Sequence, residues 1–261
     1  MKNSGEILRR IIGEVNMRIL DKSKYNLTTS WFNNIGGSDV TVNSIRLGEI
    51  GNIFVNDNDD FYSSYIQTNY GFHFLGGEYD SEFMLQVYDY IMDEIVPEQK
   101  LHPYMFLFGN DDLWLKAFED RFSKLNGRYI DRLYYHLNKE RFFSNEDQHN
   151  QLPEGYTVKR VDDPEIEVKF VVYDHGEEIG TCCNGARGKY ADIDMFIRED
   201  YRYKGIGVCL GTHFIRYCLD NGYELRGGSW IINEPSVKVA KKMGFDVVMT
   251  TKGYICEIPG K

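Results

Sequence analysis

The chain has 261 residues, 42% of them hydrophobic and 15% aromatic, which is enough apolar surface for a folded core. A formal net charge of −10 argues against nucleic acid as a partner, because proteins grip phosphate backbones mainly through clustered Lys and Arg. No run approaches the roughly 20 apolar residues of a membrane span, and Glu14, Asn16 and Arg18 interrupt any signal-peptide core near the N-terminus.

The first half of the chain alternates helical and strand patterns. We expect a helix from Ser4 to about Asp21, polar turns over 33–44, strands over 50–60, 71–78, 104–109 and 128–138, and helices over 81–96 and 110–127. Pro97 should close the helix 81–96, while Asn110 should cap the helix 110–127 and Gly127 should end it. This pattern predicts an α/β domain over residues 1–150, in which no catalytic signature is found.

Residues 138–155 are polar and charged and end in Pro-Glu-Gly, so they mark the expected boundary with a second domain over 151–261. Strands are predicted there over 156–161, 168–173, 178–182, 191–197, 245–250 and 253–258, and helices over about 206–221 and 235–243. The strand 191–197 places Asp192 and Asp194 on one face, where each carboxylate needs water or a partner.

The turn after that strand combines basic residues with glycines at a helix start, in the sequence Arg202-Tyr203-Lys204-Gly205-Ile206-Gly207. It lacks the GxxxxGK[ST] pattern of a P-loop, and Leu210 stands where the dinucleotide fingerprint GxGxxG needs its third glycine. Glycine lets a ligand approach the backbone, and the first N–H groups of a helix lie at the positive end of its dipole. The turn therefore suits a pyrophosphate.

The cysteines all lie in the last third of the chain: Cys182, Cys183, Cys209, Cys218 and Cys256. They lack the spacing of a zinc site or of a CxxC redox pair. We expect free buried thiols, no metal site, and a protein of the reducing cytoplasm.

Two motifs carry a family resemblance. Arg202-x-x-Gly205-x-Gly207 after a strand resembles the acyl-CoA-binding motif [Q/R]-x-x-G-x-[G/A] of the GNAT superfamily of N-acetyltransferases. The stretch "SWIINEPSVKVAKKMGF" is similar to the second GNAT motif, with a strand ending at Asn233, a helix, and Gly244 before the next strand. The resemblance covers about residues 155–258, and the preceding half fits a bacterial two-domain GNAT subfamily more loosely.

The resemblance implies a GNAT fold for residues 151–261: a mixed, mostly antiparallel sheet with splayed central strands, flanked by helices. One splayed strand would face the pantetheine arm and thioester, and main-chain N–H groups of the glycine turn would wrap the pyrophosphate. The implied contacts of acetyl-CoA are Met195, Phe196, Ile197, Arg202, Tyr203, Lys204, Gly205, Ile206, Gly207, Val208, Asn233 and Ser236. Asn233 is also suited to cap the helix that follows it.

The catalytic groups depart from the family pattern. Ala240 stands where many members carry a tyrosine acid, and the glutamate that some members carry on the preceding strand is missing too. Asp194 is the candidate base because it lies nearest the expected thioester, with Asp192 as its alternative. Tyr254 and Ser236 are the candidate acids.

The favoured function is therefore an acyl-CoA-dependent N-acyltransferase that uses acetyl-CoA and works by direct attack in a ternary complex. The acceptor would be an amine-bearing small molecule or protein, and the sequence leaves its identity and the oligomeric state open. The alternative is a degenerate GNAT module that binds CoA or a protein partner without turnover. A third hypothesis makes the N-terminal half a domain that recruits a protein target, with the aromatic strand 128–138 as an exposed patch.

Overall fold

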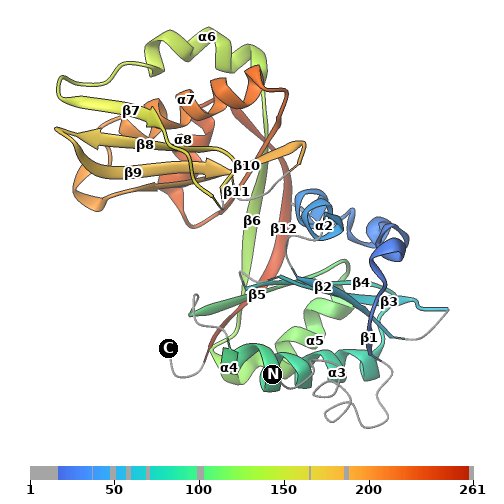
Figure 1. The fold of residues 1–261 in the computed structure, drawn as a ribbon. Coiled ribbons are helices and arrows are strands. Elements are labelled where there is room, and N and C mark those ends of the chain that lie inside the picture. Colours follow the sequence, from blue (N-terminus) through green and yellow to red (C-terminus); the bar gives the residue numbers. More distant parts are fainter. Residues whose placement is uncertain are drawn as a thin grey trace. The chain divides into compact units, whose positions relative to one another are not determined.

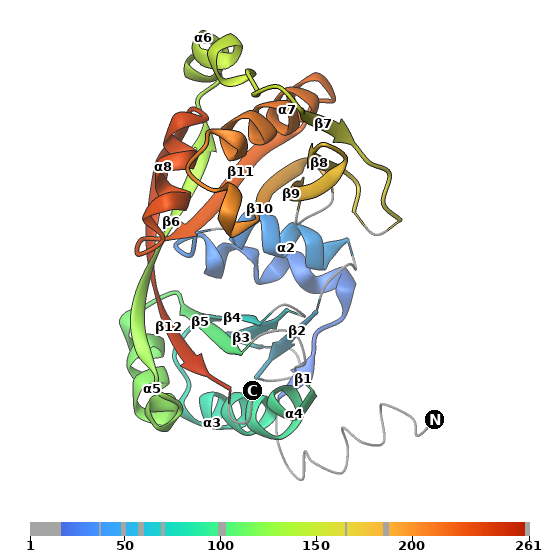
Figure 2. The same ribbon diagram turned by 90° about the vertical axis from the view of Figure 1, so that its left-hand side faces the viewer.

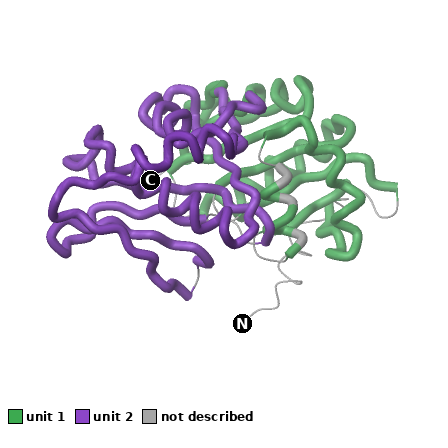
Figure 3. Tube along the Cα trace, turned by 90° about the horizontal axis from the view of Figure 1, so that it is seen from above, with its two compact units in different colours: residues 1–130, 252–261 green, residues 131–251 purple. Residues whose placement is uncertain are grey.

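The chain folds into two compact units (Figure 3). The computed structural model describes residues 17–36, 38–47, 51–56, 60–68, 71–98, 103–164, 166–184 and 188–258. The first unit comprises residues 1–130 and 252–261, and the second unit residues 131–251. The domain boundary expected at residue 150 therefore falls inside the second unit.

The segment expected to be a linker is instead a helix, α6 (Lys139–His149). The side chain of Asn138 caps it by accepting a hydrogen bond from the Arg141 N–H at 3.1 Å. Phe142 packs into the core of the second unit, and Glu146 forms an ion pair with Arg216. The polar residues of this segment are thus the solvent face of a docked helix, which a composition-based boundary cannot distinguish from a linker.

Strands of the first unit follow one another in the order β1-β2-β3-β4-β5-β12, which is one half of a 12-stranded order (Figure 1). The strands are β1 (Arg18–Ile19), β2 (Asn52–Val55), β3 (Ser63–Gln67), β4 (Phe72–Gly77), β5 (Tyr104–Gly109) and β12 (Phe245–Glu257). The first four pair antiparallel in turn, β4 and β5 run parallel, and the end of β12 pairs antiparallel with β5. β12 begins in the second unit and ends in the first.

Helices lie on both faces of this sheet, with α3 (Ser81–Tyr90) and α5 (Asp112–Phe122) on one face and α2 (Ser38–Arg46) on the other (Figures 1 and 2). The α-helices are α2 (Ser38–Arg46), α3 (Ser81–Tyr90), α4 (Val96–Glu98) and α5 (Asp112–Phe122), and the shorter 3-10 and π segments are η1 (Lys22–Leu27), η2 (Thr29–Phe32), η3 (Ile91–Ile95) and η4 (Ser123–Leu125). Trp114 and Phe118 of α5 and Phe83 of α3 pack into the core of the unit. These residues supply the apolar burial that holds the helices on the sheet.

Several local expectations for this half need correction. Asp111, not Asn110, caps α5, because its carboxylate accepts the N–H groups of Leu113 and Trp114 at 2.9 and 3.1 Å. The left-handed residue that ends this helical stretch is Asn126, with φ 51°, rather than Gly127. Pro97 does not close the helix at residue 96, because α3, η3 and α4 form one helical stretch over 81–98 that includes it.

Other expectations fail at the N-terminal side. The predicted helix 4–21 lies mostly outside the described residues, but Arg18–Ile19 is a strand and Asp21 caps η1, so a helix does not reach Asp21. Helix α2 lies in the stretch 33–44 that was expected to form turns, and strand β3 was not predicted. Propensity is a weak guide for such short segments, in which tertiary contacts decide the structure.

The second unit contains a sheet in the order β6-β11-β10-β9-β8-β7. Its strands are β6 (Arg128–Leu137), β7 (Tyr156–Arg160), β8 (Lys169–Asp174), β9 (Glu177–Asn184), β10 (Tyr190–Ile197) and β11 (Glu224–Trp230). With α6, its helical segments are η5 (Glu199–Tyr201), α7 (Ile206–Asp220) and α8 (Glu234–Lys242). Among the described residues of this sheet, β10 and β11 pair parallel and the other neighbouring strands pair antiparallel, which confirms the predicted mixed, mostly antiparallel architecture.

The two units repeat one strand order. Each has four strands in antiparallel succession, then a parallel neighbour, then an antiparallel strand that completes the sheet. In the second unit that completing strand is β6, which begins in the first unit, and in the first unit it is the end of β12. The first half of the chain is therefore a second copy of the same architecture.

Strand β6 is largely core rather than an exposed aromatic patch. Tyr134 and Tyr135 are buried, as is Ile130, while Tyr129 is partly exposed. The patch proposed for recruiting a protein target is therefore absent from this strand. Across the described segments, we find no helix that combines the length and the apolarity needed to cross a bilayer.

His73 in β4 makes the stability of the first unit depend on pH. Its ring is fully buried, shares a 2.6 Å hydrogen bond with the Tyr65 hydroxyl, and has its pKa lowered by burial from 6.5 to about 3. The unfolded chain takes up this proton below about pH 6.5 but the folded chain does not until about pH 3. The free energy of unfolding should therefore fall as the pH decreases through this window, by up to about 1.4 kcal/mol per pH unit.

We expect His73→Asn to remove that part of the pH dependence, because the amide can still bond to Tyr65 but does not titrate. Denaturant unfolding followed by tryptophan fluorescence at several pH values between 7 and 4 measures it. His175→Gln removes an exposed imidazole that is paired with Asp174, so its profile should differ from that of the wild type far less than the His73→Asn profile does. Parallel profiles for wild type and His73→Asn would contradict the assignment.

Candidate functional site

Strands β10 and β11 separate partway along their length. Tyr190–Asp192 of β10 pairs with Glu224–Arg226 of β11, and among the described residues their pairing ends there. Beyond this point, residues 193–197 pair with β9, and β11 pairs with β6. The predicted splay is therefore present, and it begins immediately after Asp192.

Alternate backbone groups of β10 face this gap. The Arg198 N–H donates to the Ile179 carbonyl of β9 at 2.9 Å. Hydrogen-bonded pairs alternate along an antiparallel ladder, so the backbone N–H and carbonyl groups of Asp194 and Phe196 also face β9. The backbone groups of Met195 and Ile197 face the other way, into the gap. Phe196 was expected to present its backbone to the thioester as well, but the register turns it toward β9.

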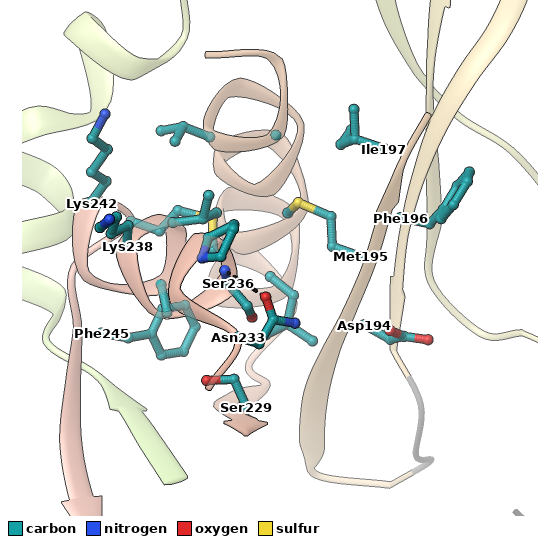
Figure 4. A pocket seen from close by; sticks show the side chains of 18 of the residues that line it. Asp194, Met195, Phe196, Ile197, Ser229, Asn233, Ser236, Lys238, Lys242 and Phe245 are labelled. Carbon is teal, nitrogen blue, oxygen red and sulfur yellow. Dashed lines mark hydrogen bonds between the residues drawn. The ribbon is translucent and has the colours of Figure 1, made fainter. Parts of the chain in front are cut away.

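A pocket of about 690 Å³ occupies the gap (Figure 4). Its lining includes the candidate base Asp194 and the predicted cofactor contacts Met195, Phe196, Ile197, Arg202, Tyr203, Gly205, Gly207, Val208, Asn233 and Ser236. It also includes residues that were not predicted, namely Tyr201, Arg132, Tyr135, Ser229, Trp230, Lys238, Lys242, Met243 and Phe245. The structure therefore brings together nearly all of the residues predicted from the two motifs.

The pocket is lined from both faces of the sheet. A Cβ atom on Gly207 of α7 would lie 3.3 Å from the Met195 sulfur and 3.5 Å from Ile197, so these two side chains face α7. Side chains alternate along a strand, and Asp194 and Phe196 accordingly point to the opposite side of β10, as Figure 4 shows. A molecule bound on the α7 side can thus meet, within the gap, a second molecule bound on the other side.

The start of α7 has the properties of an anion site. Gly205 is its N-cap, with φ 81°, and supplies no side-chain cap. The first helical bonds run from Val208 and Cys209 to the Gly205 carbonyl, so the N–H groups of Ile206 and Gly207 precede the helical ladder. A Cβ atom on Gly205 would meet nothing within 4 Å, which leaves room for a ligand at the positive end of the helix dipole.

The corresponding place in the first unit is closed. There the parallel strands β4 and β5 stay paired from Phe72 to Leu75, and the Asp80 carboxylate caps α3 by accepting the N–H groups of Glu82 and Phe83. A carboxylate on those N–H groups repels a phosphate. Within the described residues, the second unit alone therefore combines a strand gap with an uncapped helix start.

Side chains of the glycine turn take varied roles. Arg202 donates from Nε to the Ile197 carbonyl at 3.0 Å and so ties the turn to the end of β10. Lys204 lies over the Tyr201 ring, at 4.9 Å from its centre, and does not line the pocket. The Ile206 side chain is buried in the core, so any contact it makes with a ligand is through its backbone.

Helix α8 forms another wall of the pocket. The Asn233 carboxamide caps it by accepting the Ser236 N–H at 3.3 Å, so the capping role expected from the sequence is present. Lys238 and Lys242, one turn apart on this helix, add positive charge to the lining, and Lys238 is paired with Glu234 at 3.0 Å. Ala240, at the position of the missing tyrosine, lies between them.

Tyr254 is not part of this site. It is buried in the core of the first unit, beside Gly127 and the ring of Tyr129, and does not line the pocket. The strand pattern predicted two strands, 245–250 and 253–258, but they form the single strand β12 (Phe245–Glu257), whose last residues pair with β5 of the first unit. Tyr254 is accordingly a packing residue and no longer a candidate acid.

A buried pair of hydroxyls supplies a different candidate acid. The Tyr135 hydroxyl of β6 and the Ser229 hydroxyl of β11 are 2.6 Å apart, and both side chains line the pocket. The sequence shows tyrosines along β6, but their proximity to the site depends on the register of β6 against β11, in which Tyr135 lies opposite Gly227. A Cβ atom at Gly227 would lie 3.7 Å from the Tyr135 ring and 3.0 Å from the Ile193 side chain, so the glycine leaves space between these two side chains.

The cysteines are free and mostly buried. Burial raises the pKa of the Cys209 thiol to about 11 and that of Cys218 to about 12, so neither is a thiolate at neutral pH. In the described part of the chain, no cluster of three or more His, Cys, Asp or Glu residues has the arrangement of a metal site.

Comparison with known proteins agrees with this architecture. A family model described as GNAT acetyltransferase matches residues 29–175 and 168–254. A curated relative, the uncharacterized N-acetyltransferase YdfB of Bacillus subtilis (strain 168), is 22% identical over 223 residues, which cover 76% of this chain and 82% of that protein.

Solved structures show the same fold. A GCN5-related N-acetyltransferase-like protein from Streptococcus suis superposes with a TM-score of 0.68 at 18% identity, over 89% of this chain and 98% of its own. A GCN5-related N-acetyltransferase from Sphaerobacter thermophilus gives a TM-score of 0.61 at 11% identity, over 94% and 96%. A tandem GNAT protein from the clavulanic acid biosynthesis pathway gives 0.55 at 10%, over 95% and 100%.

Proposed function

The chain belongs to the GNAT acetyltransferase family, and from that premise we propose that it transfers an acetyl group from acetyl-CoA to an amine. The observation that carries the proposal is the coincidence, in one pocket, of a strand gap and an uncapped helix start. A family member without turnover would not need a gap that opens to both faces of the sheet. The first unit, which lacks both features in its described residues, would then act as a structural partner of the second.

The pocket fits acetyl-CoA in three respects. The N–H groups at the start of α7 suit the pyrophosphate, with no side chain on Gly205 to obstruct it. The outward N–H and carbonyl of Met195 and the N–H of Ile197, whose carbonyl is taken by Arg202, suit the amides of the pantetheine arm, which would lie in the gap like an added strand. Lys238 and Lys242 provide positive charge on α8 for the remaining phosphate.

The reaction joins the acceptor nitrogen to the acetyl carbon and breaks the carbon–sulfur bond of the thioester. The amine gives up a proton and the departing thiolate gains one, so the products are an N-acetylated acceptor and free CoA. A backbone N–H of Met195 or Ile197 stabilises the negative charge on the acetyl oxygen as the bond forms, an effect worth roughly 3 to 4 kcal/mol in other enzymes.

Two groups of this chain are placed to move the protons. Asp194 accepts the amine proton on the face away from α7. It is preferred to Asp192 because it lies beyond the point of separation and lines the pocket, whereas Asp192 is opposite Arg226 where the strands still pair. Tyr135, hydrogen bonded to Ser229 on the α7 side, protonates the thiolate.

The alternative, a degenerate module that binds CoA without turnover, rests on Ala240 in place of the family's tyrosine. The Tyr135–Ser229 pair answers that objection, because it places hydroxyls in the same pocket from a different strand. Release of free thiol from acetyl-CoA in the presence of a panel of amines distinguishes the two. Tight binding of acetyl-CoA with no thiol release from any amine would favour the degenerate module.

Gly205 tests the cofactor site. Gly205→Asp should weaken acetyl-CoA binding by about 100-fold, near 2.7 kcal/mol, because the carboxylate would cap α7 as Asp80 caps α3 and repel the pyrophosphate. Gly205→Asn has nearly the same size and tolerates the positive φ, so its loss should be much smaller. Calorimetric titration measures both affinities. Equal affinities for the two variants would sink the assignment.

Asp194 tests the base. Asp194→Asn should lower kcat by roughly 10² at neutral pH and leave acetyl-CoA affinity nearly unchanged, as expected when a general base is lost. The deficit should shrink at high pH, because more of the acceptor amine is already deprotonated in solution. A pH profile of turnover by thiol release measures both effects. A folded variant with the wild-type rate would show that another group, or none, accepts the proton.

Tyr135 tests the acid. Tyr135→Phe should lower kcat by about 10², since the ring still packs but no hydroxyl protonates the thiolate. The neighbouring Tyr134→Phe is the control, because Tyr134 is buried to a similar degree but points to the other face of β6. Steady-state kinetics with saturating acetyl-CoA gives the comparison. Similar rates for the two variants would remove Tyr135 from the mechanism.

A further inference from the structure

Ile193 lies at the narrow end of the gap, where β10 and β11 rejoin. It is the first residue of β10 beyond the paired stretch, which among the described residues ends at Asp192 opposite Arg226. The next residue on β11 is Gly227, and a Cβ atom there would lie only 3.0 Å from the Cγ2 methyl group of Ile193. That distance is shorter than an ordinary contact between two carbon atoms. The space that the glycine leaves is therefore too small for a further methyl group.

Two side chains wall this narrow end on the α7 side of the sheet. Side chains alternate along a strand, so Ile193 shares the α7 side with Met195 and not with Asp194. Tyr135 lies opposite Gly227 in the β6–β11 register, and its ring would be 3.7 Å from a Cβ atom on that glycine. Ile193, Tyr135 and Gly227 all line the pocket. On this side the gap thus ends against the Tyr135 ring and the branched side chain of Ile193.

The donor would enter the gap from its wide end. The start of α7, which is proposed to bind the pyrophosphate, lies beside the last residues of β10, since a Cβ atom on Gly207 would be 3.3 Å from the Met195 sulfur and 3.5 Å from Ile197. A strand advances about 3.3 Å per residue, so Ile193 lies roughly 13 Å from Ile197 along β10. An extended pantetheine arm would cover that length toward the narrow end. Its thioester would then lie beside Tyr135, the proposed acid, with the acyl group against Ile193.

We infer that Ile193 sets the length of the acyl chain that the donor carries. An acetyl group fits against this side chain, whereas each further methylene has to displace Ile193 or the Tyr135 ring. Both side chains pack against the core of the second unit, which resists such a displacement. Ile193 is thus a specificity-determining residue of the donor site and not a catalytic residue. The inference rests on the proposed acetyl transfer, and it restricts the donor to short acyl groups.

A series of straight-chain donors on the wild-type protein gives the first test. Acetyl-, propionyl-, butyryl- and hexanoyl-CoA are compared by thiol release, with an amine that the protein acetylates. Butyryl-CoA should have a kcat/KM about 100-fold below that of acetyl-CoA, because each methylene without room in a filled pocket costs roughly 10-fold or more. Equal use of acetyl- and butyryl-CoA by the wild type would overturn the inference.

Variants at position 193 assign the limit to this side chain. Ile193→Ala removes the Cγ2 methyl group and should raise the ratio of butyryl to acetyl kcat/KM by about 30-fold or more. Ile193→Val is the matched control, because valine keeps the methyl group that faces Gly227 and should keep a ratio close to that of the wild type. Each ratio compares two donors on the same variant, so it does not depend on the fraction of active protein. Thermal unfolding verifies that each variant is folded.

Gly227→Ala tests the same contact from the other strand. Its methyl group would enter 3.0 Å from Ile193 and should lower the use of every donor, acetyl-CoA included. Combined with Ile193→Ala, it takes up space that the isoleucine vacates, and the preference for acetyl-CoA should return. Equal losses from Gly227→Ala in both backgrounds would show that the two residues do not jointly limit the acyl group.

Phe196 provides the test of the opposite direction. Its side chain lines the pocket on the other side of β10, with 58% of its surface exposed. If Phe196→Ala raised the use of butyryl-CoA and Ile193→Ala did not, the acyl chain would lie on that side, which would overturn the inference and leave acetyl transfer intact. Failure to bind acetyl-CoA or any longer acyl-CoA in calorimetry would remove the proposed function itself, and the inference with it.

Discussion

The separation of β10 from β11 after Asp192 is the constraint on which the site depends. Paired strands satisfy each other's backbone groups, and parting them directs the N–H and carbonyl of Met195 and the N–H of Ile197 into a gap where a ligand can bond them. The same separation opens a passage between the two faces of the sheet. Donor and acceptor can then approach from opposite sides, and the groups placed for proton transfer lie on the matching faces.

The comparison of the two units shows what such a gap requires. In the first unit, β4 and β5 remain paired, and ring contacts across them, tilted between Phe72 and Phe106 and stacked between Phe74 and Phe108, hold the strands together. In the second unit, the corresponding stretch of β11 is the pair Gly227-Gly228, which offers no such side-chain contacts across the gap. One strand order thus supports either a closed sheet or a binding site, according to the residues at these positions.

The parts of the site that the sequence predicted are those fixed by neighbours along the chain. Gly205 and Gly207 mark a turn because of their own backbone freedom, and the alternation of residues 191–197 places Asp194 on a face. Tyr135 and Arg132 escaped prediction because their positions depend on the register of β6 against β11, strands about 90 residues apart. The same limit explains Tyr254, where a strand over 253–258 was predicted but its pairing with β5 was not.

The last strand of each sheet is supplied by a strand that begins in the other unit, β12 for the first unit and β6 for the second. The first unit therefore cannot finish folding until β12 has been synthesised. Strand β5 in the first unit pairs with the end of β12, which is synthesised about 150 residues after it. Until then, one edge of the first sheet exposes unpaired backbone groups, a condition that favours association with other chains. A premature stop codon before residue 252 would therefore damage the half of the protein that was translated first, not only the half in which it occurs.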